Sequence, residues 1–127
     1  MQAEKRQAAI YCRVANADDF ALERQRLTLH RFAESQGFEI TAEYLDNGEK
    51  GLTLDRPAFS QLDNDMLEGR IHALIVLDTS RIGRESLAVS KWLDKAHAHG
   101  VEVISEHGDL QDFELLTSLF YKTKNRK

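Results

Sequence analysis

The sequence predicts a single doubly wound α/β domain, in which helices cover both faces of a mostly parallel sheet. Short apolar runs suited to buried strands alternate with longer segments whose apolar residues recur at helical spacing. The length of 127 residues is ordinary for one domain with its own core. The predicted order is therefore β-α-β-α-β-α-β.

The first predicted strand covers residues 8–14 and stops abruptly at Arg13. A run of about seven residues suits a buried central strand better than a helix. Because ligands of open α/β sheets sit at the carboxyl ends of such strands, we expect Arg13 to point into a crevice there. Cys12, the only cysteine, lies inside this run and is expected to be a packed thiol.

A helix is predicted over residues 20–36, with capping carboxylates before it and Gly37 as its C-cap. Residues 38–44 alternate apolar and polar side chains, which predicts a strand near the sheet edge. The polar segment 46–51 contains two glycines and predicts a mobile loop. The apolar residues of the helix are spaced for one broad buried face: Phe20, Leu22, Leu27, Leu29, Phe32 and Ala33.

Pro57 is well placed for the first turn of a second helix, which Gly69 ends. Residues 71–77 form an apolar run and predict the third strand. A further helix is predicted over 85–99, with Gly100 as its stop, and a fourth strand over 101–105. These elements complete the predicted alternation.

Four arginines follow or flank the predicted strands. If strands 8–14 and 71–77 are parallel and adjacent, Arg13, Arg81 and Arg84 converge, and Arg56 joins them from a loop. An isolated arginine pair is most often a solvated helix start or a surface ion pair. Several convergent guanidinium groups, by contrast, offer planar forks of donors that match phosphate oxygens. The sequence therefore predicts a phosphate site.

An ordered set of motifs resembles the catalytic domain of the serine recombinases, the resolvase and invertase family. The resemblance covers roughly residues 7–108 and implies a resolvase-like fold, a role in DNA recombination and integration on a mobile element, and DNA as partner. We expect no cofactor and no metal. The motifs are Tyr11-Cys12-Arg13-Val14, Tyr44-Leu45-Asp46-Asn47-Gly48 with Gly51 and Asp55-Arg56-Pro57, and Arg81-Ile82-Gly83-Arg84.

Two positions depart from the family pattern. A serine two residues after the first arginine attacks a DNA phosphodiester in this family and forms a phosphoserine link. This chain has Ala15 there, and a methyl group cannot attack phosphorus. Ser80 stands where the family usually has an aspartate directly before its arginine pair. The resemblance implies phosphate or DNA binding by Arg13, Arg56, Arg81 and Arg84, and it matches Gln25, shifted by one residue, to a glutamine of the first helix.

Other interpretations of single residues are weaker. Asp78 could be a phospho-acceptor, but the first strand ends without the carboxylates that would hold Mg²⁺. Thr79 and Ser80 offer hydroxyls as substitute nucleophiles, with no adjacent base in the sequence. His97 and His99 are two residues apart on a helix and face different directions, which disfavours a shared metal.

The ends of the chain and its charge limit the partners. We expect a disordered lead-in at 1–6, a short helix at 109–121 and a basic tail at 122–127, without a separate DNA-reading domain. Because the net charge is −4, we expect any DNA affinity to be local, in the arginine crevice, the tail or both. An apolar face on the short helix predicts a homodimer or association with an active recombinase: Phe113, Leu116 and Phe120. Without a signal peptide or a run near the ~20 apolar residues of a membrane helix, we expect a cytoplasmic protein with no membrane partner.

Two functional hypotheses remain. In the first, the chain is a recombinase-like protein of a mobile element that no longer cuts DNA and has a binding or regulatory role. In the second, it is the catalytic domain of an active strand-exchange recombinase, inactivated by an introduced Ala15 or truncated from a longer chain. Ser80, which a designer would have had no reason to change, favours the first.

Overall fold

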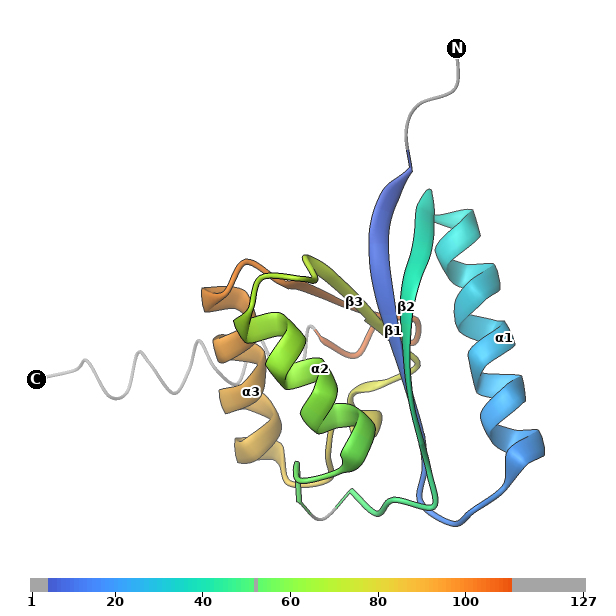
Figure 1. Cartoon of the computed structure of the whole chain (residues 1–127). Coiled ribbons are helices and arrows are strands. Elements are labelled where there is room, and N and C mark those ends of the chain that lie inside the picture. The colour runs from blue at the N-terminus through green and yellow to red at the C-terminus, as the bar shows by residue number, and fades with distance from the viewer. Residues whose placement is uncertain (1–4, 52, 111–127) are drawn as a thin grey trace, which may run out of the picture.

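The computed structural model describes residues 5–51 and 53–110, and it confirms the α/β class and the predicted alternation (Figure 1). Each predicted element within these residues is present, and a short 3₁₀ turn, η1, follows the third strand. The elements are β1 (Arg6–Val14), α1 (Asp19–Ser35), β2 (Phe38–Asn47), α2 (Pro57–Leu67), β3 (Ala73–Val76), η1 (Thr79–Arg81), α3 (Ser86–Ala98) and β4 (Glu102–Ser105).

The strands form one parallel sheet in the order β2-β1-β3-β4. β2 is an edge strand, as its alternating pattern predicts, and β1 lies inside the sheet. α1 covers one face, and α2 and α3 cover the other (Figure 1). Because β1 and β3 are adjacent and parallel, the residues that follow their carboxyl ends lie at the same edge of the sheet.

Side chains of β1 alternate between two hydrophobic cores, as the pleat of a strand requires. Ile10 and Cys12 pack under α1, whereas Tyr11 faces α2 and α3. On that second face the Phe59 ring lies 5.2 Å from Tyr11 and 4.9 Å from Trp92, between centroids. The strand end that bears Arg13 is therefore fixed from both faces of the sheet.

The predicted ends of the helices are confirmed by their capping. The Asp18 carboxylate accepts a hydrogen bond from the Ala21 backbone N–H at 3.0 Å and caps α1. Gly37, directly after the C-cap, has a φ of +79°, a conformation that favours glycine. Pro57 occupies the first turn of α2.

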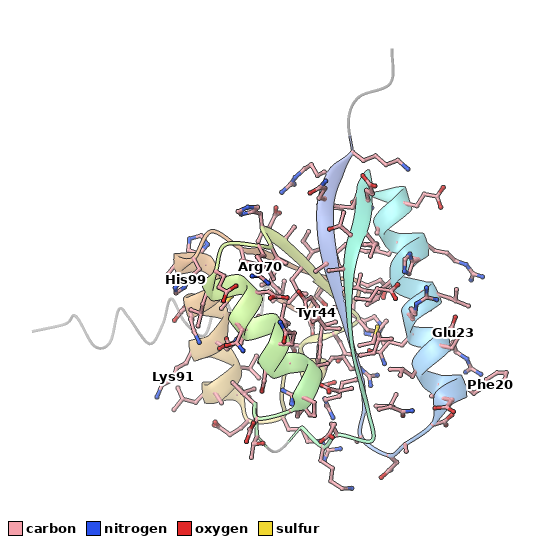
Figure 2. The ribbon with its side chains drawn as sticks, in the orientation of Figure 1. Phe20, Glu23, Tyr44, Arg70, Lys91 and His99 are labelled. Carbon is pink, nitrogen blue, oxygen red and sulfur yellow. The ribbon has the colours of Figure 1, made fainter. Side chains whose placement is uncertain are left out.

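The predicted apolar face of α1 is only partly correct. Leu29 and Ala33 are buried, but Phe20 is 79% exposed and Leu27 is 43% exposed. Phe20 points away from the sheet (Figure 2). A helix advances 100° per residue, so positions 20 and 27 fall opposite the stripe 25, 29 and 33 that meets the sheet. The polar Gln25 occupies the buried position instead.

Three boundaries differ from the predicted ones. β1 begins at Arg6, inside the expected lead-in, because Arg6 pairs with Phe38 and donates a hydrogen bond to Glu102 at 2.7 Å. β2 continues through Asp46 and Asn47, which we expected in a loop, because they pair with Arg13 and Val14. β3 is shorter than residues 71–77.

The predicted helix at 109–121, its apolar face and the basic tail lie outside the described residues, except for 109 and 110. Across residues 5–51 and 53–110, no helix has the length and hydropathy needed to cross a bilayer.

Candidate functional site

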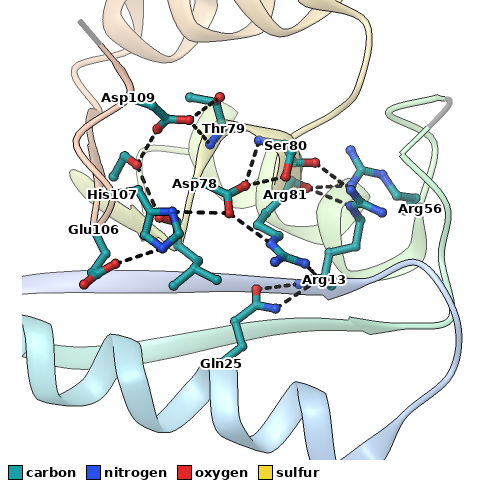
Figure 3. A network of polar contacts seen from close by, with 12 residues as sticks. Arg13, Gln25, Arg56, Asp78, Thr79, Ser80, Arg81, Glu106, His107 and Asp109 are labelled. Carbon is teal, nitrogen blue, oxygen red and sulfur yellow. Dashed lines mark hydrogen bonds and ion pairs between the residues drawn. The ribbon is translucent and has the colours of Figure 1, made fainter.

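Arg13, Arg56 and Arg81 meet at the carboxyl ends of β1 and β3, where the sequence predicts their convergence (Figure 3). The Arg81 carbonyl oxygen accepts hydrogen bonds from Arg13 Nε at 3.0 Å and from Arg56 Nη1 at 2.9 Å. Two guanidinium groups thus share one backbone acceptor in η1. We call these residues, together with Arg84, the arginine cluster.

Arg13 is 3% exposed, and its guanidinium is occupied by backbone carbonyls. Besides Arg81, it donates to the Glu49 carbonyl at 2.9 Å and to the Ser80 carbonyl at 2.5 Å. These bonds join the end of β1 to the loop after β2 and to η1. The Arg13 side chain therefore connects three segments that lie far apart in the sequence.

The backbone of Arg13 is held by side chains. Gln25 Oε1 accepts from the Arg13 N–H at 3.0 Å, and Gln25 Nε2 donates to the Arg13 carbonyl at 3.1 Å. Arg81 Nη1 also donates to that carbonyl, at 2.9 Å. β1 pairs with β3 only as far as Tyr11. Beyond that residue, the Gln25 and Arg81 side chains satisfy the backbone groups of Arg13 in place of strand-to-strand hydrogen bonds. Gln25 thus uses both of its amide atoms on the strand.

Arg56 is 1% exposed and lies in the core. Its guanidinium carbon is 4.7 Å from the centre of the Phe59 ring, and it donates to the Tyr11 hydroxyl at 3.0 Å and to the Ile82 carbonyl. Tyr11 in turn donates to Asp46 at 2.7 Å. Burial and this hydrogen bond raise the pKa of Tyr11, so the phenol stays protonated and can serve as a donor.

Asp46 completes the base of the site from the end of β2. It is buried and accepts from the backbone N–H groups of Ala58 at 2.8 Å and Phe59 at 3.0 Å. These groups belong to the first turn of α2, where the N-cap residue Arg56 makes no side-chain cap. A carboxylate at a helix N-terminus is favourable because the free N–H groups point at it. Asp46 therefore fixes the helix that begins beside Arg56.

Arg81 and Arg84 are the more accessible members of the cluster. Arg81 is half-buried, and its Nε lies 3.6 Å from Asp78 Oδ2 without a hydrogen-bond partner among the described residues. Arg84 is exposed. A Cβ at Gly51 would lie 2.8 Å from Arg13 Nη2 and 3.1 Å from Arg84 Cγ. Glycine at this position therefore leaves room for both arginine side chains to pack against the loop.

The two departing positions lie beside the cluster. Ala15 directly follows β1, and the preceding Val14 carbonyl accepts from the backbone N–H of Gly48 at 2.9 Å. Ser80 is exposed, and its N–H and hydroxyl both donate to Asp78 Oδ1. The carboxylate nearest Arg81 thus comes from Asp78, a role that sequence analysis missed. An aspartate directly before a short turn, followed by a serine two residues on, was the available signal.

The cluster is positively charged, and its inner members are not neutralised. Burial lowers the pKa of Arg13, and the nearby charge of Arg56 lowers it further. Neither arginine forms an ion pair within the described residues, since backbone carbonyls are their main partners. Those residues also hold no group of three side chains suited to a metal ion. The arrangement suits an anion that approaches Arg84 and Arg81 from solvent.

Comparisons with known proteins identify the family and the fold of the chain. A family model described as "Resolvase, N terminal domain" matches residues 8–121. Among curated proteins, none matches the sequence.

Three solved structures share the fold. The N-terminal catalytic domain of TP901-1 integrase is 21% identical, with a TM-score of 0.77, covering 94% of this chain and 99% of that one. A resolvase family site-specific recombinase from Streptococcus pneumoniae is 25% identical, with a TM-score of 0.76, covering 94% and 89%. The C-terminal catalytic domain of ISC1926 TnpA, an IS607-like serine recombinase, is 23% identical, with a TM-score of 0.73, covering 89% and 77%.

Proposed function

The chain belongs to the resolvase family of serine recombinases, and on this basis we propose that it is a catalytically inactive recombinase domain of a mobile genetic element that still binds DNA phosphate. The observation behind the inactivity is the side chain at position 15. Ala15 directly follows β1 beside the arginine cluster, at the position that the family fills with its nucleophilic serine. A methyl group has no lone pair for attack on phosphorus and no acidic proton for a base to remove.

The outer arginines support retained phosphate binding. Arg84 is exposed and its guanidinium has no partner within the described residues, while Arg81 is half-buried and lies beside it, with its Nη1 donating to the Arg13 carbonyl. We propose that these two contact the DNA backbone, and that Arg13 and Arg56 hold the turn from which they project. In this proposal Gln25 acts on the Arg13 backbone. Such a domain acts by occupying DNA or by pairing with an active recombinase.

Fluorescence anisotropy of a labelled random duplex tests the binding. We expect the affinity to fall with salt by a log-log slope of about −0.9 per phosphate contact. Arg84→Ala should weaken binding and make the slope less steep by about 0.9, the value expected for one phosphate contact. The matched control is Arg31→Ala, which removes an exposed arginine from α1 on the far side of that helix from the sheet. Absence of binding at low salt, or equal losses in both variants, would refute the retained phosphate site.

A second experiment tests the inactivity. We expect the wild-type chain to leave supercoiled plasmid intact and to form no protein-DNA adduct. Ala15→Ser, alone and with Ser80→Asp, restores the family residues at the two departing positions. Adducts formed by Ala15→Ser alone would show that a complete active site lacks only its nucleophile, which is the outcome expected of a recombinase inactivated by one substitution.

A further inference from the structure

The turn η1 and Ile82, which directly follows it, supply backbone acceptors for the arginine cluster. The carbonyls of Ser80, Arg81 and Ile82 receive the guanidinium donors of Arg13 and Arg56. A 3₁₀ turn of three residues has too few internal hydrogen bonds to hold its own shape. Its conformation must therefore be fixed by groups from other segments.

Carboxylates fix the amino end of this turn. Asp78 accepts from the Ser80 N–H at 3.0 Å, and Asp109 accepts from the Thr79 N–H at 3.1 Å. Asp109 Oδ2 also accepts from the Thr79 hydroxyl at 2.7 Å, while Oδ1 accepts from the Ser105 hydroxyl at 2.6 Å. Asp109 thus accepts three hydrogen bonds, one from β4 and two from η1 (Figure 3).

The bonded partners of Asp109 are buried. Thr79 is 6% exposed and Ser105 is 7% exposed, so water cannot readily replace the carboxylate. Burial alone would raise the pKa of Asp109, but the hydrogen bonds from Ser105 and Thr79 outweigh it and lower the pKa. The residue lies 30 positions after Thr79 and just beyond β4. Gly108, with a φ of +74°, turns the chain back so that Asp109 reaches η1.

We propose that Asp109 is a positioning residue for the arginine cluster: it fixes η1 from the chain segment after β4 and so sets the carbonyls that align Arg13 and Arg56. The part concerning DNA rests on the proposed function.

The test compares Asp109→Ala with Asp109→Asn in the full chain. Both remove the same negative charge, but the asparagine Oδ1 can still accept from Thr79 and its Nδ2 can donate to Ser105. In Asp109→Ala we expect amide exchange at Arg81, Ile82 and Gly83 to be about tenfold faster, with Asp109→Asn close to wild type. Exchange at Ile10 and Tyr11, in the centre of β1, should be unchanged in both variants.

The same proteins are then titrated with the labelled duplex at low salt. We expect Asp109→Ala to bind about fivefold or more weakly than Asp109→Asn. Equal exchange in the two variants refutes the positioning role, and different exchange with equal affinity refutes its link to DNA. If wild type binds no duplex, the proposed function fails while the exchange comparison still decides the role of Asp109. Thr79→Val, which removes only one of the bonds, replaces Asp109→Ala if that variant fails to fold, and it should give a smaller change in the same direction.

Discussion

Arg56→Met should unfold the protein more easily, even though it removes one of several crowded positive charges. The substitution leaves the Ile82 carbonyl unpaired in the core, removes donors to Tyr11 and Arg81, and ends the stacking on Phe59. An unpaired buried polar group costs about 1–3 kcal/mol and a lost hydrogen bond to a charged group about 1.5–3 kcal/mol. Because burial of the methionine side chain restores part of the lost stability, we expect the free energy of unfolding to fall by about 3–5 kcal/mol in total.

Urea unfolding measures this loss through the fluorescence of Trp92, the only tryptophan, which is buried beside Phe59. With an m-value of about 2 kcal/mol per M, the midpoint should fall by about 1.5–2.5 M. The matched control, Arg84→Met, changes an exposed arginine and should shift stability by less than about 0.5 kcal/mol. If Arg56 existed only to bind an anion, its removal would relieve repulsion and stabilise the free protein. An unchanged or higher midpoint for Arg56→Met would therefore refute the structural role.

Three further predictions concern other parts of the fold. Leu29→Ala should cost about 2–5 kcal/mol in urea unfolding and Leu27→Ala less than about 1 kcal/mol, because only Leu29 is fully buried; equal costs would contradict the packing of α1. Burial alone would raise the pKa of Glu43, but hydrogen bonds from Arg26 and His30 outweigh it and lower the pKa. The contribution of Glu43 is therefore present above the ordinary carboxyl pKa and lost as the pH falls through the lowered value, so Glu43→Gln should flatten the loss of stability in urea unfolding as the pH falls below the ordinary carboxyl pKa. Burial raises the pKa of Cys12 to about 12, so thiol reagents should modify it in urea but not in the native protein, and rapid native labelling would contradict its packing.

The order of elements could be predicted because each has a local signal. Gly37, Pro57 and Asp18 end or begin helices through their own backbone and side-chain chemistry, and the structure confirms them. Phe20 and Leu27 were misassigned because hydrophobicity alone does not identify the side of a helix that meets a sheet. Gln25 occupies the buried position, where its amide forms hydrogen bonds with the backbone of Arg13 in β1.

The meeting of the arginines was predictable from the parallel topology, but their hydrogen-bond partners were not. Arg13 and Arg56 donate to carbonyls of the loop after β2 and of η1, and the direction of a carbonyl depends on how distant segments pack. No spacing in the sequence contains that information. The same holds for Asp46, whose position at the end of β2 became clear only from its pairing with Arg13.

The burial of two arginines in the framework has a consequence for how such sequences diverge. Arg13 and Arg56 are buried and donate to backbone carbonyls, so replacing either is expected to lower the stability of the domain whether or not it cuts DNA. Ala15, half-buried with a methyl group for a side chain, carries no comparable folding requirement in this chain. The two framework arginines alone are therefore not expected to distinguish a domain that cuts DNA from one that does not, and the residue that directly follows β1 is expected to be more informative.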